Sequence, residues 1–163
     1  MSTVLILDNI RSAHNVGSIF RTADGAGVEQ IFLVGTTPDP IDRFGRVQPE
    51  IAKTSLGATT SVVWEHSGGH SDRATEAVLD LLTRLQARGY TVVAVEQTAT
   101  SIPLYEHTPT AQVAYILGAE VEGVQPALVA AADEVVEIPM VGQKESLNVS
   151  VTAGIVLFQS QRC

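Results

Sequence analysis

Polar residues of types that bind ligands are concentrated between two apolar stretches near the end of the chain. The apolar stretches span residues 135–138 and 149–158, and their patterns indicate a short buried strand and a helix. Between them stand Gly142, Gln143, Lys144, Glu145, Ser146 and Asn148. Open α/β sheets bind ligands where the carboxyl end of a strand leads into a helix, because unsatisfied helix N–H groups favour anions and polar groups. The position of this cluster therefore predicts a ligand site.

A second polar set lies in residues 8–28, DNIRSAHNVGSIFRTADGAGV. Asn15 is a residue type that caps helices, and Arg21 follows it by nearly two helical turns, so the two side chains need not share a face. A guanidinium on an otherwise apolar helix needs an anionic partner, and phosphate fits its fork of donors best. On residue type alone, an ion pair between Arg21 and a carboxylate is the more common arrangement.

A third set follows an expected strand in residues 115–128, YILGAEVEGVQPAL. Gly118 ends the strand and Glu120 follows it, so a ligand can approach the backbone closely there; a plain turn is the alternative. The glycine spacing does not match a dinucleotide-binding loop, and the sequence around Lys144 lacks the pattern of a phosphate-binding P-loop. The sequence indicates neither dinucleotide nor nucleoside-triphosphate binding.

The elements that position these residues alternate between buried strands and amphipathic helices. This order predicts a mainly parallel sheet with helices on both faces. We expect strands at residues 3–7, 30–34, 60–64, 91–96, 113–117 and 134–138, and helices at 15–26, 49–55, 72–88, 125–131 and 147–160. The helix at 72–88 has Ser71 or Asp72 as its expected N-cap. The irregular segments 35–48 and 98–110 follow strands, so we expect both to border a pocket.

Length and composition limit the class of protein. The 163 residues fit one domain, spanning 1–163, and neither a membrane span nor a signal peptide is expected. The single cysteine, Cys163, supports neither a disulfide framework nor a cysteine-based zinc site, which fits a cytoplasmic protein. The formal charge of −8 is unusual for a nucleic-acid-binding protein, so any contact with nucleic acid must be local.

Together, the three segments resemble the SpoU (TrmH-like) family of RNA ribose 2′-O-methyltransferases, within the SPOUT superfamily. The first family motif is similar to Asn15, Arg21 and the following TADGAGV, and the second to Gly118, Glu120 and Gly123. The third is similar to the run from Ile138 to Met140 followed by SLNVS at residues 146–150, and KTSLGA at 53–58 also resembles the family. The resemblance covers residues 7–158 without an additional RNA-binding domain, so we expect a single SpoU-type domain.

This resemblance implies a C-terminal deep trefoil knot whose loops hold S-adenosyl-L-methionine, and it implies a homodimer. Apolar residues with free backbone groups would hold the cofactor, with two residues from the preceding strand nearby. The implied cofactor residues are Gly118, Ile138, Met140 and Leu147, with Glu96 and Gln97. Burial of adenine against apolar side chains with main-chain hydrogen bonds is typical of such sites. Without the motif, we would predict that these residues belong to the hydrophobic core.

The chemistry of methyl transfer sets the roles of the polar residues. A ribose hydroxyl must lose its proton while it is held about 3 to 3.5 Å from the methyl carbon. The resemblance places Arg21 at the ribose. A guanidinium stays protonated at neutral pH, so we favour Arg21 as a clamp on the RNA phosphate, with that phosphate or water relaying the proton, over Arg21 as general base. Asn15 and Ser146 would hold the substrate or Arg21, Glu120 would orient neighbouring groups, and Asn148 would fix the knot loop.

The remaining candidates concern metal and RNA. His66 and His70 are four residues apart, but the intervening Ser-Gly-Gly disfavours a helix, so we expect a flexible surface loop and no metal site. His14 adjoins Asn15 and is either an RNA contact or a surface residue. We expect a basic rim around the pocket that consists of Arg11, Arg43, Arg46 and Lys53. The excess acid, including Glu65, Asp72, Glu76, Asp80, Asp133 and Glu134, would then lie elsewhere.

Two functions from different classes remain after the sequence alone. The first is an S-adenosyl-L-methionine-dependent RNA 2′-O-methyltransferase that acts on tRNA or, as the second choice, on rRNA. The second is a non-catalytic knotted subunit that binds RNA or a partner, which the net acidity favours. The complete polar set of Asn15, Arg21, Glu120, Ser146 and Asn148 favours the enzyme. An unrelated α/β domain that binds a small molecule requires the motif match to be accidental.

Overall fold

The chain folds into a seven-stranded parallel sheet covered by helices, in a computed structural model that describes residues 1–69 and 74–161. The strands are β1 (Ser2–Asp8), β2 (Gln30–Val34), β3 (Val63–Ser67), β4 (Thr91–Val95), β5 (Ile102–Pro103), β6 (Gln112–Leu117) and β7 (Glu134–Glu137). The helices are α1 (Ala13–Gly25), α2 (Pro49–Ser55), α3 (Ala58–Ser61), α4 (Ala74–Ala87), α5 (Pro126–Ala131) and α6 (Val149–Ser160), with a 3-10 turn η1 (Leu104–Glu106). The spatial order is β3-β2-β1-β6-β4-β7-β5, and every neighbouring pair is parallel. All strands therefore end at the same edge of the sheet.

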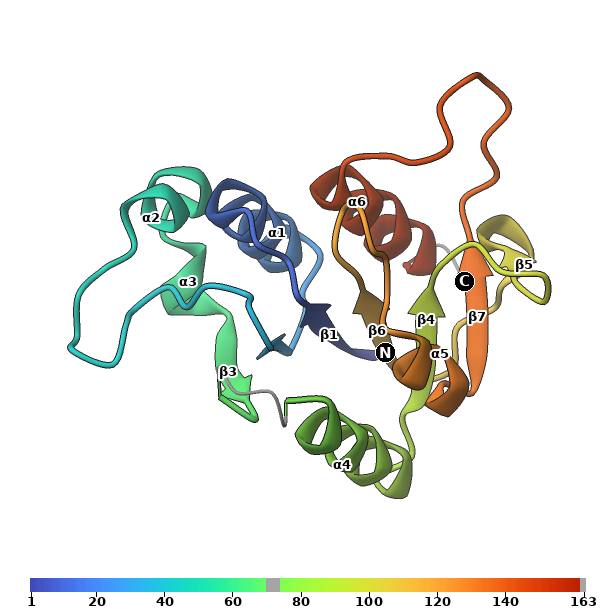
Figure 1. Cartoon of the computed structure of the whole chain (residues 1–163), viewed down its shortest axis with the longest axis horizontal. Coiled ribbons are helices and arrows are strands. Elements are labelled where there is room, and N and C mark those ends of the chain that lie inside the picture. The colour runs from blue at the N-terminus through green and yellow to red at the C-terminus, as the bar shows by residue number, and fades with distance from the viewer. Residues whose placement is uncertain (70–73, 162–163) are drawn as a thin grey trace.

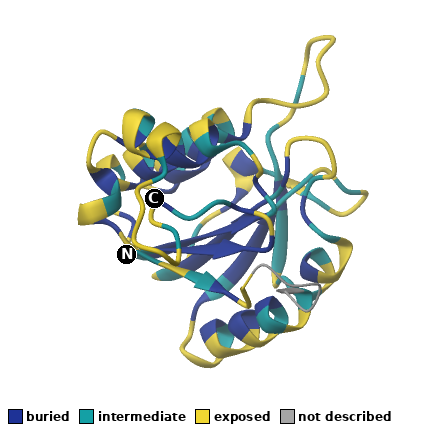
Figure 2. Cartoon of the chain, turned by 60° about the vertical axis from the view of Figure 1, so that its left-hand side comes forward, coloured by how far each residue is buried: buried dark blue, intermediate teal, exposed yellow. Residues whose placement is uncertain are grey.

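Alternate residues of the central strands point into two separate apolar layers. On β1, Leu5 and Leu7 pack into one cluster with residues of α1, α2 and α6, whereas Val4 and Ile6 pack into another with residues of α4 and α5. Both faces of β1 are thus buried, as Figure 2 shows for the middle of the sheet. Figure 1 shows the two helical layers on either side. The predicted mainly parallel sheet with helices on both faces is confirmed.

The strand predicted at residues 60–64 is present but begins three residues later than predicted. The β-branched, apolar run at residues 60–64 predicts a strand, but Ala58–Ser61 forms the short helix α3 and β3 begins only at Val63. The reason is local: Leu56 and Gly57 both adopt positive φ angles, of 49° and 90°, and turn the chain into α3. The two-residue strand β5 is absent from the sequence prediction, because a strand so short carries no periodic signal.

The beginning of α1 also differs from the expectation for Asn15. Ser12 is the N-cap, and its Oγ accepts a hydrogen bond from the backbone N–H of Asn15 at 3.2 Å. Asn15 is inside the helix and nearly buried, so its side-chain amide is available for contacts with other segments. The expected N-cap of α4 at Ser71 or Asp72 lies outside the described residues.

A buried polar network fastens α6 to the sheet. The hydroxyl of Tyr115 on β6 lies 2.7 Å from Oγ of Ser160 at the end of α6, and 3.3 Å from Nε2 of His107. Nδ1 of His107 lies 3.0 Å from a carboxylate oxygen of Glu134 on β7. Because unpaired polar groups are costly in a core, these bonds fix the position of α6 against β6 and β7. None of the described helices has the length and apolar character needed to cross a membrane.

Candidate functional site

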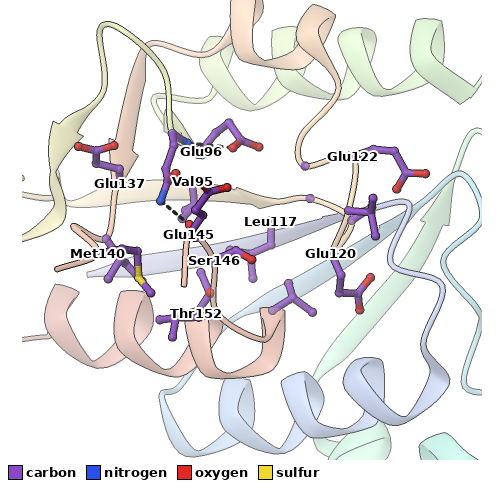
Figure 3. Close-up of a pocket in the computed structure, with 18 residues that line it drawn as sticks. Val95, Glu96, Leu117, Glu120, Glu122, Glu137, Met140, Glu145, Ser146 and Thr152 are labelled. Atoms are coloured by element: carbon purple, nitrogen blue, oxygen red, sulfur yellow. Dashed lines mark hydrogen bonds between the residues drawn. The ribbon is translucent and has the colours of Figure 1, made fainter. Parts of the chain in front are cut away.

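A pocket of about 330 Å³ lies where β4, β6 and β7 end and α6 begins (Figure 3). Its position at the carboxyl edge of a parallel sheet is the one where such folds bind ligands. All six predicted cofactor residues line it, namely Glu96, Gln97, Gly118, Ile138, Met140 and Leu147. Glu120 and Ser146 line it too, whereas Asn15, Arg21 and Asn148 do not. The structure therefore brings two of the three predicted segments directly into one cavity.

The turn after β6 forms one wall of the pocket and has no space for a side chain at Gly118. A Cβ there would lie 2.1 Å from the backbone nitrogen of Val124 and 2.2 Å from the carbonyl carbon of Gly123. The turn is closed by backbone hydrogen bonds between Ala119 and Gly123, of 2.9 and 3.2 Å. Glycine at position 118 is thus required by the turn itself, and its role extends beyond access for a ligand.

Glu96 supports the same turn from β4. Its carboxylate accepts hydrogen bonds from the backbone N–H groups of Val124, at 2.8 Å, and Gln97, at 2.9 Å. The neighbouring Gln97 donates from Nε2 to the backbone carbonyl of Glu145 at 2.9 Å. The end of β4 therefore holds both the turn after β6 and the long loop before α6 (Figure 3). Glu145 lines the pocket, although the sequence assigned no role to it or to Lys144.

Three polar residues from distant segments form a hydrogen-bonded chain beside the pocket. Nδ2 of Asn15 donates to Oε1 of Glu120 at 2.6 Å, and Nδ2 of Asn148 donates to Oδ1 of Asn15 at 3.2 Å. Oδ1 of Asn148 then accepts from the backbone N–H of Ser150 at 2.8 Å, which makes Asn148 the N-cap of α6. These hydrogen bonds orient the Glu120 carboxylate and connect α1, the turn after β6 and α6.

Arg21 lies on the exposed surface of α1 and is outside the pocket lining. Among residues 1–69 and 74–161, no carboxylate forms an ion pair with it. The ion pair that residue type alone favours is therefore not observed within the described part of the chain. Helix α1 packs between α2 and α6 (Figure 1). It carries both Arg21 and Asn15, the central residue of the hydrogen-bonded set with Glu120 and Asn148.

The predicted basic residues are distributed over several segments. Arg11 lies between β1 and α1 and pairs with Glu122 at 3.3 Å, so it lies next to the turn that lines the pocket. Arg43 and Arg46 lie in the loop before α2, and Lys53 and His14 are exposed on α2 and α1. None of Arg11, Arg43, Arg46 and Lys53 lines the pocket, whose charged lining residues are glutamates, so the predicted basic rim is wrong. Contact of these residues with RNA stays a prediction.

The prediction for the histidine pair is wrong in one respect. His66 lies on β3 with its side chain nearly buried and its Nδ1 2.5 Å from a carboxylate oxygen of Asp39, so it is not in a flexible surface loop. His70 lies outside the described residues. Within the part of the chain that the structure describes, no three His, Cys, Asp or Glu side chains are arranged to hold a metal ion.

The pocket combines apolar walls with an acidic rim. Leu117, Ile138, Met140, Leu147 and Val149 supply apolar surface, while the carboxylates come from Glu96, Glu120, Glu122, Glu137 and Glu145 (Figure 3). Glu122 and Glu137 were not predicted as site residues; Glu122 lies in the turn after β6, and Glu137 is the last residue of β7. Clustered carboxylates attract cations and repel anions. The cavity therefore suits a ligand that has an apolar or aromatic part and a positive charge.

The chain matches the model of the SpoU rRNA methylase family over residues 2–158. It is 32% identical to the 23S rRNA (guanosine-2′-O-)-methyltransferase RlmB of Pectobacterium atrosepticum, over 99% of this chain and 60% of that protein. It is 34% identical to a tRNA (guanosine(18)-2′-O)-methyltransferase of Thermus thermophilus, over 97% of this chain and 73% of that protein. The chain thus spans about three fifths of the RlmB length.

Solved structures show the same fold. A tRNA-modifying TrmH/SpoU enzyme of A. aeolicus superposes with a TM-score of 0.81 and 27% identity, over 99% of this chain and 74% of that one. An AdoMet-bound rRNA methyltransferase of Sinorhizobium meliloti gives a TM-score of 0.83 and 29% identity, over 99% of this chain and 56% of that one.

Proposed function

Because the chain belongs to the SpoU rRNA methylase family, we propose that it is an S-adenosyl-L-methionine-dependent methyltransferase acting on a ribose 2′-hydroxyl of RNA. The observation that carries this proposal is the hydrogen-bonded chain from Glu120 through Asn15 to Asn148 beside an apolar pocket with an acidic rim. A domain that only binds RNA has no need for an ordered carboxylate next to a cavity that repels phosphate.

The pocket residues fit the proposed cofactor. When bound, S-adenosyl-L-methionine supplies a methyl group activated by the positive charge of its sulfonium. The adenine would pack against Ile138, Met140 and Leu147, which line the cavity with the backbone of Gly118. The carboxylate of Glu120, already held by Asn15 at 2.6 Å, would attract the fixed positive charge of the sulfonium. These residues would bind and orient the cofactor.

Arg21 and Ser146 would position the RNA. Arg21 has no partner carboxylate among the described residues, so its guanidinium is available to bind a phosphate of the substrate in a forked arrangement. Held in this way, the neighbouring ribose hydroxyl would pass its proton to the phosphate or to water. Ser146, which lines the pocket, would donate or accept a hydrogen bond with the ribose without repelling either reactant.

We also propose the trefoil knot of this family and a homodimer. The loops after β6 and after β7 line one pocket, and Gln97 bonds to the second of them, which supports the intertwined arrangement. The second apolar face of α6 supports the dimer: Val151, Ile155 and Phe158 are exposed at helical spacing, opposite the buried side. A partner that covers this face would lie close to α1 and Arg21.

The RNA that serves as substrate is proposed to be tRNA first and rRNA second, because the chain spans 73% of the tRNA methyltransferase of T. thermophilus but 60% of the RlmB of P. atrosepticum. The competing function is a non-catalytic subunit that keeps the knot, which the formal charge of −8 favours.

Two measurements separate the enzyme from the non-catalytic subunit. Calorimetry with S-adenosyl-L-methionine tests the pocket, and transfer of a labelled methyl group into total RNA tests the reaction. The proposal expects both binding and transfer. Binding without transfer, with cell extract added to supply any partner, would refute the enzyme and support the subunit.

A further inference from the structure

The loop between β2 and α2 presents an ordered tip formed by residues 41–47. Ile41 and Val47 pair as an isolated antiparallel bridge at its base. Within the tip, Oδ1 of Asp42 accepts hydrogen bonds from the backbone N–H groups of Phe44, at 2.8 Å, and Arg46, at 3.0 Å. Gly45, with φ of 75°, closes the turn through a bond to the carbonyl of Asp42. The backbone of Phe44 is therefore fixed in an exposed position.

Two guanidinium groups lie over the Phe44 ring. The guanidinium carbon of Arg43 lies 4.8 Å from the ring centroid and that of Arg46 lies 5.0 Å from it. The residue is nevertheless 66% exposed, so much of Phe44 stays in contact with solvent. Arg46 also pairs through Nε with Asp42 at 2.8 Å, while Arg43 forms no ion pair within the described residues. An exposed aromatic ring with two cations is unusual on a chain of net charge −8.

The tip lies at the same edge of the sheet as the pocket. The loop follows the carboxyl end of β2, and the pocket lies at the carboxyl ends of β4, β6 and β7. Two strands, β1 and β6, separate β2 from β4, so the ends of β2 and β4 are about 14 Å apart at ordinary strand spacing. Figure 1 shows the loop beyond α2, on the side of α1 opposite α6. The tip and the pocket therefore belong to the same edge of the sheet, although the loop extends away from α6.

A hollow of about 790 Å³ adjoins the tip. Its lining includes Phe44, Arg43 and Arg46, together with Pro38, Val47 and His66. The hollow is apart from the pocket at the ends of β4, β6 and β7, since the two share no lining residue. It provides space beside the aromatic ring for a flat group the size of a nucleobase.

We propose that Phe44 stacks on an unpaired base of the RNA substrate while Arg43 and Arg46 contact the adjacent phosphates. This inference rests on the RNA substrate of the proposed function. Stacking on an aromatic side chain is how proteins bind single-stranded RNA, and arginine meets both the base faces and the phosphates. The base replaces one guanidinium on the ring, and the displaced arginine moves to the phosphate. An acidic surface of a protein partner could pair with the two arginines, but it would make no use of the exposed aromatic ring. The tip therefore fits RNA better than a protein partner.

The test compares RNA binding by Phe44→Ala and Phe44→Tyr with binding by wild type, using a fluorescent single-stranded RNA oligonucleotide and the same sequence as a duplex. Phe44→Ala is expected to raise Kd for the single strand about tenfold and to change duplex binding little, whereas Phe44→Tyr keeps the wild-type Kd. Tyr105→Ala is the matched control, because Tyr105 is 67% exposed and no arginine stacks on it among the described residues.

A spectroscopic signal tests the stacking itself. The only tryptophan, Trp64, is changed to Phe, and Phe44 is changed to Trp in that background. Single-stranded RNA is expected to quench the new tryptophan, and duplex RNA is not. Absence of quenching, or a Phe44→Ala variant that binds the single strand as tightly as wild type, overturns the inference.

The outcomes separate this inference from the proposed function. If the wild type transfers methyl groups and Phe44→Ala does so at the same rate with RNA below saturation, the stacking is refuted and the enzyme is left in place. Conversely, loss of single-stranded RNA binding in Phe44→Ala supports the stacking even if the wild type binds no S-adenosyl-L-methionine, a result that would refute only the enzyme.

Discussion

Replacing Gly118 by Ala tests whether the turn after β6 shapes the cofactor pocket. The added Cβ would lie 2.1 Å from the nitrogen of Val124 and 2.5 Å from the carbonyl oxygen of Gly123. Both are backbone atoms, which cannot move away as a flexible side chain can. The turn must therefore shift by roughly 1 Å or more to restore ordinary contact.

The expected cost follows from the contacts that such a shift disturbs. Overpacking of this kind costs about 1 to 3 kcal/mol. The shift also strains the hydrogen bond from Val124 to Glu96, now 2.8 Å, whose loss adds about 1 kcal/mol. We expect the free energy of unfolding to fall by about 2 to 4 kcal/mol. If the displaced turn must return to its wild-type position for S-adenosyl-L-methionine to bind, and this return costs about 2 kcal/mol, the affinity falls about 30-fold.

Urea unfolding and calorimetry with S-adenosyl-L-methionine measure the two effects. Gly142→Ala is the matched control, because a Cβ at Gly142 meets no atom within 4 Å. The control is expected to match the wild type in both assays. The reasoning is refuted if Gly118→Ala unfolds within about 0.5 kcal/mol of the wild type and binds the cofactor equally well.

Three further substitutions test other parts of the account. Asn148→Ala removes both the α6 N-cap and the bond to Asn15, so urea unfolding should show a free energy of unfolding lower by about 2 kcal/mol. Ser12→Ala removes only the α1 N-cap and should lower it by about 1 kcal/mol. Arg21→Ala should lower labelled methyl transfer about 100-fold or more while calorimetry shows unchanged cofactor binding; retained activity would exclude Arg21 from its role. Burial raises the pKa of Asp8 above its ordinary value of 3.8, so the folded chain keeps a proton that the unfolded chain has lost. The contribution of Asp8 to the free energy of unfolding should therefore decline as pH rises from 3.8 through the folded value, and the difference between the wild type and Asp8→Asn in urea titrations at several pH values should show this decline.

The elements with regular patterns were predictable from the sequence. Residues 30–34 and 49–55 form the expected strand and helix without any change of bounds, because an apolar β-branched run and an N-terminal proline are strong local signals. The start of the strand predicted at residues 60–64 was missed, because the left-handed backbone at Leu56 is uncommon for a residue other than glycine and has no signal in the sequence.

The candidate site was predictable only in part. Gly118, Glu120 and Ser146 stand in short motifs after strands, and family resemblance was sufficient to name them. The contact between Asn15 and Glu120 joins residues 105 positions apart, which no local rule specifies. The support that Glu96 gives to Val124 was missed for the same reason, since it depends on how β4 and β6 lie next to each other. The exposed ring of Phe44 carried no periodic signal either.

The central claim is that this pocket supports methyl transfer to a ribose hydroxyl. Its most direct test is mass spectrometry of nucleosides from RNA that has been incubated with the protein and S-adenosyl-L-methionine. We expect a nucleoside methylated at the ribose 2′-oxygen, which is absent when the Arg21→Ala variant is used. A methyl group on a base, or no methylated nucleoside from any RNA even when cell extract is added, would contradict it.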